Sequence, residues 1–336
     1  MNNSVETPAP ALRIAVAGSG YMGRGIANTL ARGGAGAVIL ADQSAERAAA
    51  ALKQMLAEVA QAERDGLVAP GSVEKVAAVS SAAPSLAHAV ADADVVVEAV
   101  FEDIAVKHGV LREIEAAAPG SAVIATNTSA IPVGDLAAVL DRPERFFGVH
   151  WFNPAPYLPS VEIIIGARSD PSLLGPFTAL LEASGKAPVK VADTPGFICN
   201  RIQFAMFAEA ARMVEEGSAT PEQIDAVVQS SFGFRLPFFG PFAIADMAGL
   251  DVYANSYATL AAQLGDRFTC PPSLRARVEA GDLGTKTGGG YLGLSPEDAE
   301  RMARLRDRSY VALSSLRTQL ASAAPAGQAE ETAVPE

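Results

Sequence analysis

His150 is the residue whose type and position most clearly suit catalytic chemistry. The chain contains only three histidines. It follows the apolar run 146–149, where a strand is expected to end, and Glu162 lies twelve positions further on. A histidine at a strand end with a carboxylate within reach suits general acid–base work near neutral pH. A histidine beside apolar residues is more often an ordinary core residue than a catalytic one. Whether His150 is catalytic must therefore be judged from the other segments of the chain that could form a site with it.

A glycine-rich loop at residues 18–23 supplies the second chemical signal, since it fits the pattern GxGxxG. A strand-like run precedes it and a helix-compatible stretch follows it. In that context the first glycine permits a tight turn, the second lets the backbone approach a pyrophosphate, and the third allows close helix–strand packing. The loop therefore predicts a dinucleotide site. The loop residues expected at the cofactor are Gly18, Gly20, Tyr21, Met22 and Gly23.

Asp42 follows the next expected strand, 24 positions after Gly18. An acid at this point accepts hydrogen bonds from the ribose hydroxyls and repels a 2′-phosphate, which favours NAD over NADP. Arg47 lies five residues further on, so some tolerance of NADP stays open.

The bulk composition narrows the class of protein. With 336 residues the chain has room for about two domains, and 26 basic against 38 acidic residues give a net charge of −12. That balance argues against binding to nucleic acid or to an anionic membrane. Cys199 and Cys270 offer neither a disulfide framework nor a metal pattern and are expected to be buried small hydrophobes, so no metal site is predicted. No long apolar run or signal-like N-terminus is found, so a cytoplasmic protein is expected.

Short apolar runs alternate with helical patterns in the first half of the chain. Most runs are continuously apolar, which is typical of parallel strands covered on both faces. The expected strands are 14–17, 38–40, 95–97, 123–125, 146–149 and 162–165. We therefore predict an α/β fold of the Rossmann type, a doubly wound and mostly parallel sheet, over residues 12–192.

The character of the sequence changes at the predicted linker 193–196. No strand is expected after it, and helices are predicted over 197–216, from a capping box at 220–223, and from 295–298 towards Leu320. We predict an all-helical domain over residues 193–320. Polar or Ala/Gly/Pro/Glu-rich tails at 1–11 and 321–336 are expected to be disordered.

Four segments are expected to converge at the carboxyl ends of the strands: 127–129, 150–154, Glu162 and 195–201. In this order, behind a dinucleotide loop, they closely resemble the L-3-hydroxyacyl-CoA dehydrogenase family over residues 13 to about 291. Further matches are 97–102 with Lys107, and the segments 240–242, 246–251 and 284–288.

The resemblance implies roles for the matching residues. His150 would take the hydroxyl proton while hydride leaves carbon 3 for the nicotinamide, and Glu162 would fix its tautomer and favour the imidazolium. Ser129 and Asn200 match contacts to the substrate's reacting oxygen and neighbouring carbonyl, and Asn153 matches a residue that lines the nicotinamide and substrate region. The matched family contacts to NAD are Glu102, Lys107 and Lys286. The resemblance also implies a homodimer formed through the helical domain.

Several of these matches have a plainer interpretation that the sequence leaves open. Asn127 and Thr128 could simply shape a turn, and Glu98 could be structural or functional. Lys286 could be a solvated lysine in a glycine-rich loop.

The chain also departs from the family pattern in ways that bear on the substrate. Only Lys53 and Arg64 are basic in the stretch 48–64, where the family is lysine-rich and holds coenzyme A phosphates. Residues 157–160 replace a usual lysine, and Arg235 lies in the loop 232–240. This pattern looks more like relatives that act on small free acids, such as L-gulonate 3-dehydrogenase of the lambda-crystallin type, carnitine dehydrogenase and pyridine-carboxylate dehydrogenases. An arginine can grip a carboxylate bidentately, although Arg235 could equally form a surface or interdomain ion pair.

The leading prediction is therefore an NAD-dependent oxidoreductase of fatty acid metabolism that oxidises a short-chain 3-hydroxyacyl-CoA, resembling 3-hydroxybutyryl-CoA, to the 3-oxoacyl product. A dehydrogenase of a small free hydroxy acid, whose carboxylate Arg235 would bind, is the first alternative. A crystallin-like structural protein that binds NAD without turnover is the second, and the retained His150, Glu162, Ser129 and Asn200 speak against it.

Overall fold

The computed structural model describes residues 11–323. Within the chain two compact units are distinguished, Met1–Met206 and Phe207–Glu336, and each is described by itself. The predicted tails lie outside the described residues, apart from residue 11 and residues 321–323, which are the last three of helix α14. The predicted domain boundary after residue 192 stays a prediction.

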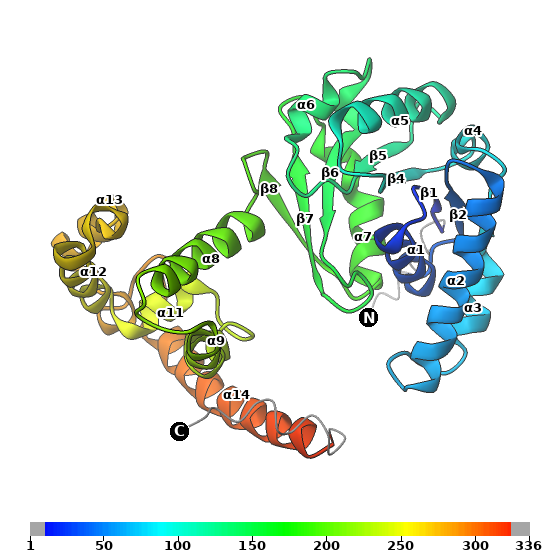
Figure 1. Ribbon diagram of the computed structural model, residues 1–336. Helices are drawn as coiled ribbons and strands as arrows, with labels where there is room; N and C mark the ends of the chain where they lie inside the picture. Colours follow the sequence, from blue (N-terminus) through cyan, green and yellow to red (C-terminus); the bar gives the residue numbers. More distant parts are fainter. Residues whose placement is uncertain (1–10, 324–336) are drawn as a thin grey trace, which may run out of the picture. The chain divides into compact units, whose positions relative to one another are not determined.

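Unit 1 is built around one eight-stranded sheet with the order β3-β2-β1-β4-β5-β6-β7-β8 (Figure 1). Every neighbouring pair is parallel except β6 and β7, which run antiparallel. The predicted doubly wound, mostly parallel sheet is confirmed. The strands are β1 (Arg13–Ala17), β2 (Ala37–Ala41), β3 (Ser80–Ala82), β4 (Val95–Glu98), β5 (Val123–Thr126), β6 (Phe146–Trp151), β7 (Ser160–Ile165) and β8 (Ala187–Ala192).

All six predicted strands are present, and β3 and β8 were missed. Both lie at the edges of the sheet, where one side of the strand has no neighbour and apolar content is lower. Strand β3 contributes only Ser80, Ser81 and Ala82, and β8 carries Pro188 and the exposed Lys190. Neither segment has the continuous apolar run by which the central strands were found.

Helices cover both faces of this sheet. Along β1, Ile14 and Val16 belong to one buried cluster, and Ala15 and Ala17 belong to another, so alternate side chains enter different cores. The first cluster is closed by α1 (Tyr21–Gly33), α2 (Ala45–Arg64), α3 (Ser72–Val79) and α7 (Gly175–Ala183). The second is closed by α4 (Leu86–Val90), α5 (Ile104–Ala117) and α6 (Val133–Ala137), which Figure 1 shows on the opposite side. Short 3₁₀ helices occupy Pro143–Arg145 and Pro171–Leu174.

Unit 2 is helical throughout its described part, as predicted. The predicted helix over 197–216 is α8 (Cys199–Glu215), which begins in unit 1. It is followed by α9 (Pro221–Ser230), α10 (Phe232–Arg235), α11 (Pro241–Ala248), α12 (Leu250–Leu264), α13 (Pro272–Glu279) and α14 (Pro296–Ala323), with 3₁₀ helices at Gly265–Phe268 and Gly284–Lys286. The capping box is confirmed, since the Thr220 hydroxyl accepts from the Gln223 N–H and the Gln223 side chain accepts from the Thr220 N–H.

Buried Asp246 explains why two of the motifs in unit 2 belong together. Its carboxylate accepts the backbone N–H groups of Tyr291 and Leu292, both at 3.0 Å. A Cβ at Gly284 or Gly290 would collide with Asp246, so each glycine is needed for close approach. The segments 246–251 and 284–288 therefore form a structural junction.

One expectation about burial needs correction. Cys199 and Cys270 are free thiols, but both are only half-buried, and Cys270 packs at the edge of a small cluster that contains Leu250 and Leu274. Residues 204–242 are rich in phenylalanine, and of these Phe239 is buried whereas Phe204, Phe207, Phe238 and Phe242 are exposed. No helix within residues 11–323 is both long and apolar enough to cross a membrane.

Candidate active site

The geometry of the loop at residues 18–23 fits the dinucleotide role that its spacing predicts. Gly18 has a φ of +95°, and a Cβ there would lie 2.6 Å from the carbonyl oxygen of Ala99. A Cβ on Gly23 would collide with the carbonyl of Gly18, so this glycine lets α1 pack against the loop. Gly20, in contrast, has nothing within 4 Å of an added Cβ and faces open space. An approaching pyrophosphate would meet bare backbone at this point.

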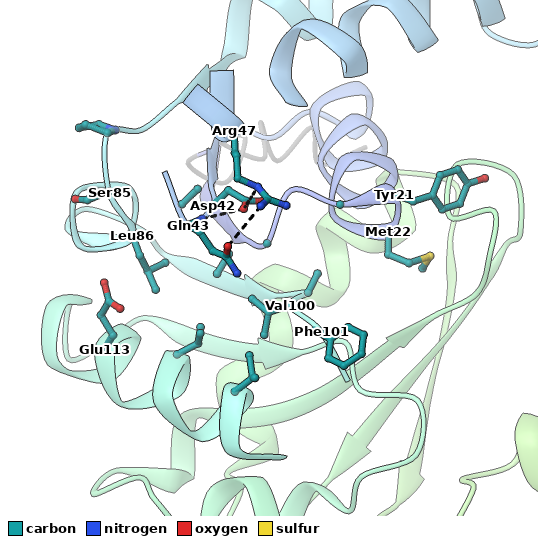
Figure 2. A pocket seen from close by; sticks show the side chains of 18 residues that line it. Tyr21, Met22, Asp42, Gln43, Arg47, Ser85, Leu86, Val100, Phe101 and Glu113 are labelled. Atoms are coloured by element: carbon teal, nitrogen blue, oxygen red, sulfur yellow. Dashed lines mark hydrogen bonds and ion pairs between the residues drawn. The ribbon is translucent and has the colours of Figure 1, made fainter. Parts of the chain in front are cut away.

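A cavity of about 710 Å³ opens beside this loop, at the carboxyl ends of β1, β2 and β4 (Figure 2). In open α/β sheets this edge is where nucleotides bind. Figure 2 shows Asp42, Gln43 and Arg47 joined by polar contacts on one wall and Glu113 on another. The lining residues are Ala17, Gly18, Gly20, Tyr21, Met22, Ala41, Asp42, Gln43, Arg47, Pro84, Ser85, Leu86, Ala99, Val100, Phe101, Val106, Val110 and Glu113. The residues present fit a dinucleotide.

Asp42 is held as a carboxylate at the end of β2. One oxygen accepts the Ser19 N–H at 3.0 Å and the Ser19 hydroxyl at 2.6 Å, and the other lies 3.2 Å from the Arg47 guanidinium. Burial acts to raise the pKa of Asp42, but the bonds from Ser19 and Gln43 and the charge of Arg47 outweigh it, so the pKa is lowered. No role was predicted for Ser19, whose hydroxyl orients the predicted ribose-binding acid.

His150 and Glu162 form a buried pair, because the antiparallel register of β6 and β7 sets them directly opposite each other. The Nδ1 of His150 lies 2.8 Å from Oε2 of Glu162. The other carboxylate oxygen accepts the N–H groups of Ile198 at 3.0 Å and Cys199 at 2.9 Å, at the start of α8. A carboxylate fixed in this way selects the tautomer with the proton on Nδ1 and leaves Nε2 as the free base.

One detail of the predicted convergence was wrong. Glu162 is the third residue of β7, which runs opposite to β6, so it does not lie at the carboxyl end of its own strand. It reaches the same edge as His150 because the connection at residues 152–159 reverses the chain direction. Burial pattern alone does not reveal strand direction.

Ser129 and Asn200 are also brought together. The Asn200 side-chain amide donates to the carbonyl oxygen of Ser129 at 2.8 Å. Glu102 accepts the Ser129 N–H at 2.8 Å and the Thr128 hydroxyl at 2.7 Å. Asn127 accepts the Trp151 N–H at 3.0 Å and so links this loop to the residue after His150. Asn127 and Thr128 thus shape the loop.

Lys107 is completely buried between two carboxylates. Its ammonium lies 2.8 Å from Glu98 and 3.2 Å from Glu102, and Glu98 also accepts the Thr126 hydroxyl at 2.6 Å. Burial acts to raise the pKa of Glu102, but the Thr128 hydroxyl and the Lys107 charge outweigh it and lower that pKa. Glu98 is therefore a structural partner of Lys107. Direct contact of Lys107 with NAD stays a prediction, as does that of Glu102.

The remaining predicted site residues are seen in separate surroundings. Asn153 is exposed in the connection between β6 and β7. Within unit 2, the Lys286 ammonium donates to Asp251 at 2.7 Å. Arg235 lines a cavity of about 270 Å³ together with Arg306 and Tyr310. The contacts predicted for these residues with NAD or substrate stay predictions.

Comparisons with known proteins agree with this geometry. Residues 13–194 match the family model described as 3-hydroxyacyl-CoA dehydrogenase, NAD binding domain, and residues 196–293 match the C-terminal domain of the same family.

Curated relatives are similar over most of the chain. A Mesorhizobium japonicum protein named 5-formyl-3-hydroxy-2-methylpyridine 4-carboxylate 5-dehydrogenase is 35% identical over 305 residues, covering 89% of this chain and 96% of the relative. A probable 3-hydroxybutyryl-CoA dehydrogenase of Bacillus subtilis is 38% identical over 280 residues, covering 83% and 96%.

Among solved structures, the 3-hydroxyacyl-CoA dehydrogenase of Archaeoglobus fulgidus is similar with a TM-score of 0.74 and 32% identity, covering 90% of this chain and 99% of the other. The chain belongs to the 3-hydroxyacyl-CoA dehydrogenase family, NAD-dependent dehydrogenases that act on CH–OH groups.

Proposed function

We propose that this protein oxidises the 3-hydroxyl group of a short-chain 3-hydroxyacyl-CoA, with 3-hydroxybutyryl-CoA as the reference substrate. The observation that carries the proposal is the buried His150–Glu162 pair, with 2.8 Å between Nδ1 and Oε2. The pair lies at the same sheet edge as the glycine-rich loop, since β1 and β6 run in the same direction. The B. subtilis relative, whose name specifies 3-hydroxybutyryl-CoA, supports this choice of substrate.

In this proposal each side chain has a defined task. Nε2 of His150 accepts the hydroxyl proton, and Glu162 stabilises the imidazolium that results. Ser129 and Asn200 orient the reacting oxygen and the neighbouring carbonyl. NAD supplies the hydride acceptor, held by the loop at residues 18–23 and by Asp42. General-base catalysis of this kind contributes about 10²–10⁴-fold to the rate.

A free hydroxy acid is the second candidate substrate, and the cavity in unit 2 favours it. Arg235 and Arg306 line that cavity, and within residues 11–323 Arg235 forms no ion pair. Ile244 and Met247 add an apolar wall. Guanidinium groups recognise carboxylates through paired, directed hydrogen bonds. The M. japonicum relative is named for a pyridine carboxylate.

A substrate panel separates the two candidates. NADH formation is measured with L-3-hydroxybutyryl-CoA, free L-3-hydroxybutyrate and a pyridine carboxylate carrying a hydroxymethyl group, using wild-type protein and Arg235→Met. Turnover of the thioester that Arg235→Met leaves unchanged supports the acyl-CoA proposal. Turnover of free acids alone, with a KM that rises at least ~10-fold in Arg235→Met, supports the second candidate, because a charge-assisted hydrogen bond contributes ~1.5–3 kcal/mol. NAD binding without turnover of any compound would favour the non-catalytic alternative.

A homodimer formed through the helical domain is part of the same proposal. Phe207, Val227 and Phe242 are 67%, 62% and 55% exposed, and large exposed apolar side chains often mark an interface. Light scattering coupled to size exclusion tests it, with Phe207→Glu expected to shift the mass towards the monomer. The predicted cytoplasmic location is likewise a proposal that cell fractionation would test.

A further inference from the structure

Lys186 is a buried ammonium group in unit 1 to which the proposed chemistry gives no task. Only 7% of the residue is exposed. Its Nζ donates to the carbonyl oxygen of Ala155 at 2.6 Å and to that of Leu158 at 2.8 Å. It also lies 5.6 Å from the centre of the Trp151 ring, on the residue directly after His150. One side chain thus contacts three points between the end of β6 and the start of β7.

The backbone beside Lys186 holds the same connection. The Ala187 N–H donates to the carbonyl oxygen of Pro159 at 2.7 Å, and Ala187 is the register partner of Ser160, the first residue of β7. Lys186 and Ala187 together donate hydrogen bonds to the backbone carbonyl groups of residues 155, 158 and 159. Glu162 follows only three residues after the last of these.

The held connection also packs against the helix of the dinucleotide loop. A Cβ added to Gly25 of α1 would lie 3.3 Å from Cβ of Ala155 and 3.3 Å from Cδ of Pro156. The middle of the 152–159 connection therefore packs against α1 at Ala155 and Pro156, and Ala155 also accepts a hydrogen bond from Lys186. This segment carries Asn153 and joins the strands of His150 and Glu162.

The charge of Lys186 is unusual for such a position. Within residues 11–323 no carboxylate pairs with Lys186 or with its neighbour Arg32, which lies in the last turn of α1. Burial and the charge of Arg32 lower the pKa of Lys186 to about 8. Burial lowers the pKa of Arg32 as well, and Tyr157 of the connection opposes this only in part. The backbone carbonyls are the groups that compensate the buried ammonium.

We propose that Lys186 is a positioning residue for hydride transfer: by fixing the 152–159 connection against α1, it keeps Asn153, His150 and Glu162 in their working arrangement. This inference rests on the proposed roles of His150 and Glu162. A small displacement of groups that must align for reaction reduces the chemical step far more than it reduces binding.

The test compares Lys186→Met, which keeps the chain length and removes the donors, with Lys186→Arg, which keeps charge and donors. Lys190→Met, on the exposed side of β8, is the matched control. Measured quantities are kcat, the substrate KM, the Kd for NAD, the melting temperature, and the primary deuterium isotope effect with substrate deuterated at carbon 3. We expect Lys186→Met to lower kcat by at least ~10-fold, to leave the Kd for NAD unchanged and to raise the isotope effect on kcat. Lys186→Arg should recover part of kcat, and Lys190→Met should match wild type.

Two results would overturn the inference. One is a wild-type kcat in Lys186→Met. The other is a fall in kcat that matches a smaller fraction of protein able to bind NAD, with an unchanged isotope effect. If Lys186→Met does not fold, Lys186→Gln, which keeps an N–H donor without the charge, is judged by the same criteria. His150→Ala is measured in parallel. If His150→Ala keeps the wild-type rate, the proposed function fails, whereas an inactive His150→Ala beside a fully active Lys186→Met removes only the role of Lys186.

Discussion

Replacing Glu162 by glutamine changes one atom of the site and should reverse the tautomer of His150. Oε1 of Glu162 accepts two backbone N–H groups, from Ile198 and Cys199, while Oε2 faces Nδ1 of His150. In Glu162→Gln the amide oxygen can keep both backbone bonds only if the NH₂ group faces His150. Nδ1 must then accept a hydrogen bond, and the ring proton moves to Nε2, where the substrate proton should be taken.

The structure also indicates why the opposite amide orientation is disfavoured. Turning the amide would set NH₂ against the Ile198 and Cys199 N–H groups, and each unsatisfied donor costs about 1–3 kcal/mol. In most molecules of Glu162→Gln, Nε2 of His150 therefore carries the ring proton and cannot accept the substrate proton. We expect kcat to fall by about 10²–10⁴-fold, or about 3–5 kcal/mol of activation free energy.

The assay is NADH formation at saturating substrate, alongside the Kd for NAD and the melting temperature. The Kd should change little, because Glu162 does not line the dinucleotide cavity. Glu162→Asp, which keeps the charge but shortens the reach, serves as a companion variant and should retain the tautomer if it retains the contact. A Glu162→Gln enzyme with wild-type kcat would refute this reasoning.

Three further predictions rest on charged residues of unit 1. Asp42→Ala should lower kcat/KM for NAD at least ~10-fold and shift the NAD/NADP ratio towards NADP, since a charge-assisted bond contributes ~1.5–3 kcal/mol; an unchanged ratio would disprove its role. Lys107→Met leaves Glu98 buried without its counter-ion and should reduce the unfolding free energy in urea by about 3–5 kcal/mol, with Lys107→Met/Glu98→Gln recovering part of the loss. For Lys186 the folded pKa of about 8 lies below the ordinary 10.5, so the unfolded chain binds more protons between these values. The contribution of Lys186 to stability is therefore greatest above pH 10.5 and is lost as the pH falls through 8. The unfolding free energy of wild type minus that of Lys186→Met should rise as the pH is raised from 8 to 10.5. A difference that stays constant with pH would contradict this.

The buried strands and the dinucleotide loop could be predicted because their signals are local. Continuous apolar runs mark strands covered on both faces. Gly18 and Gly23 are required by the turn and by close packing of the helix, and Gly20 leaves bare backbone where a pyrophosphate would approach. The edge strands β3 and β8 were not predicted, because a strand with only one neighbour needs fewer apolar side chains. The pairing of His150 with Glu162 was predicted from family resemblance, and its physical cause, the antiparallel register, became visible only in three dimensions.

Side chains that act by holding other groups of the chain in place were harder to predict. Ser19, Lys107 and Lys186 each hold a group that lies elsewhere in the chain, 23, nine and up to 31 residues away. Nothing in the local pattern distinguishes a lysine that snorkels to water from one that is enclosed by carbonyls or carboxylates. Burial of the ammonium, which requires the folded core, is the property that separates them.

The most direct test of the central claim is NADH formation from NAD and L-3-hydroxybutyryl-CoA by wild-type protein and by His150→Ala, with the Kd for NAD measured on both. We predict turnover by wild type, a fall in kcat of at least ~100-fold in His150→Ala, and an unchanged Kd. Turnover at the wild-type rate by His150→Ala would contradict the claim that His150 is the general base.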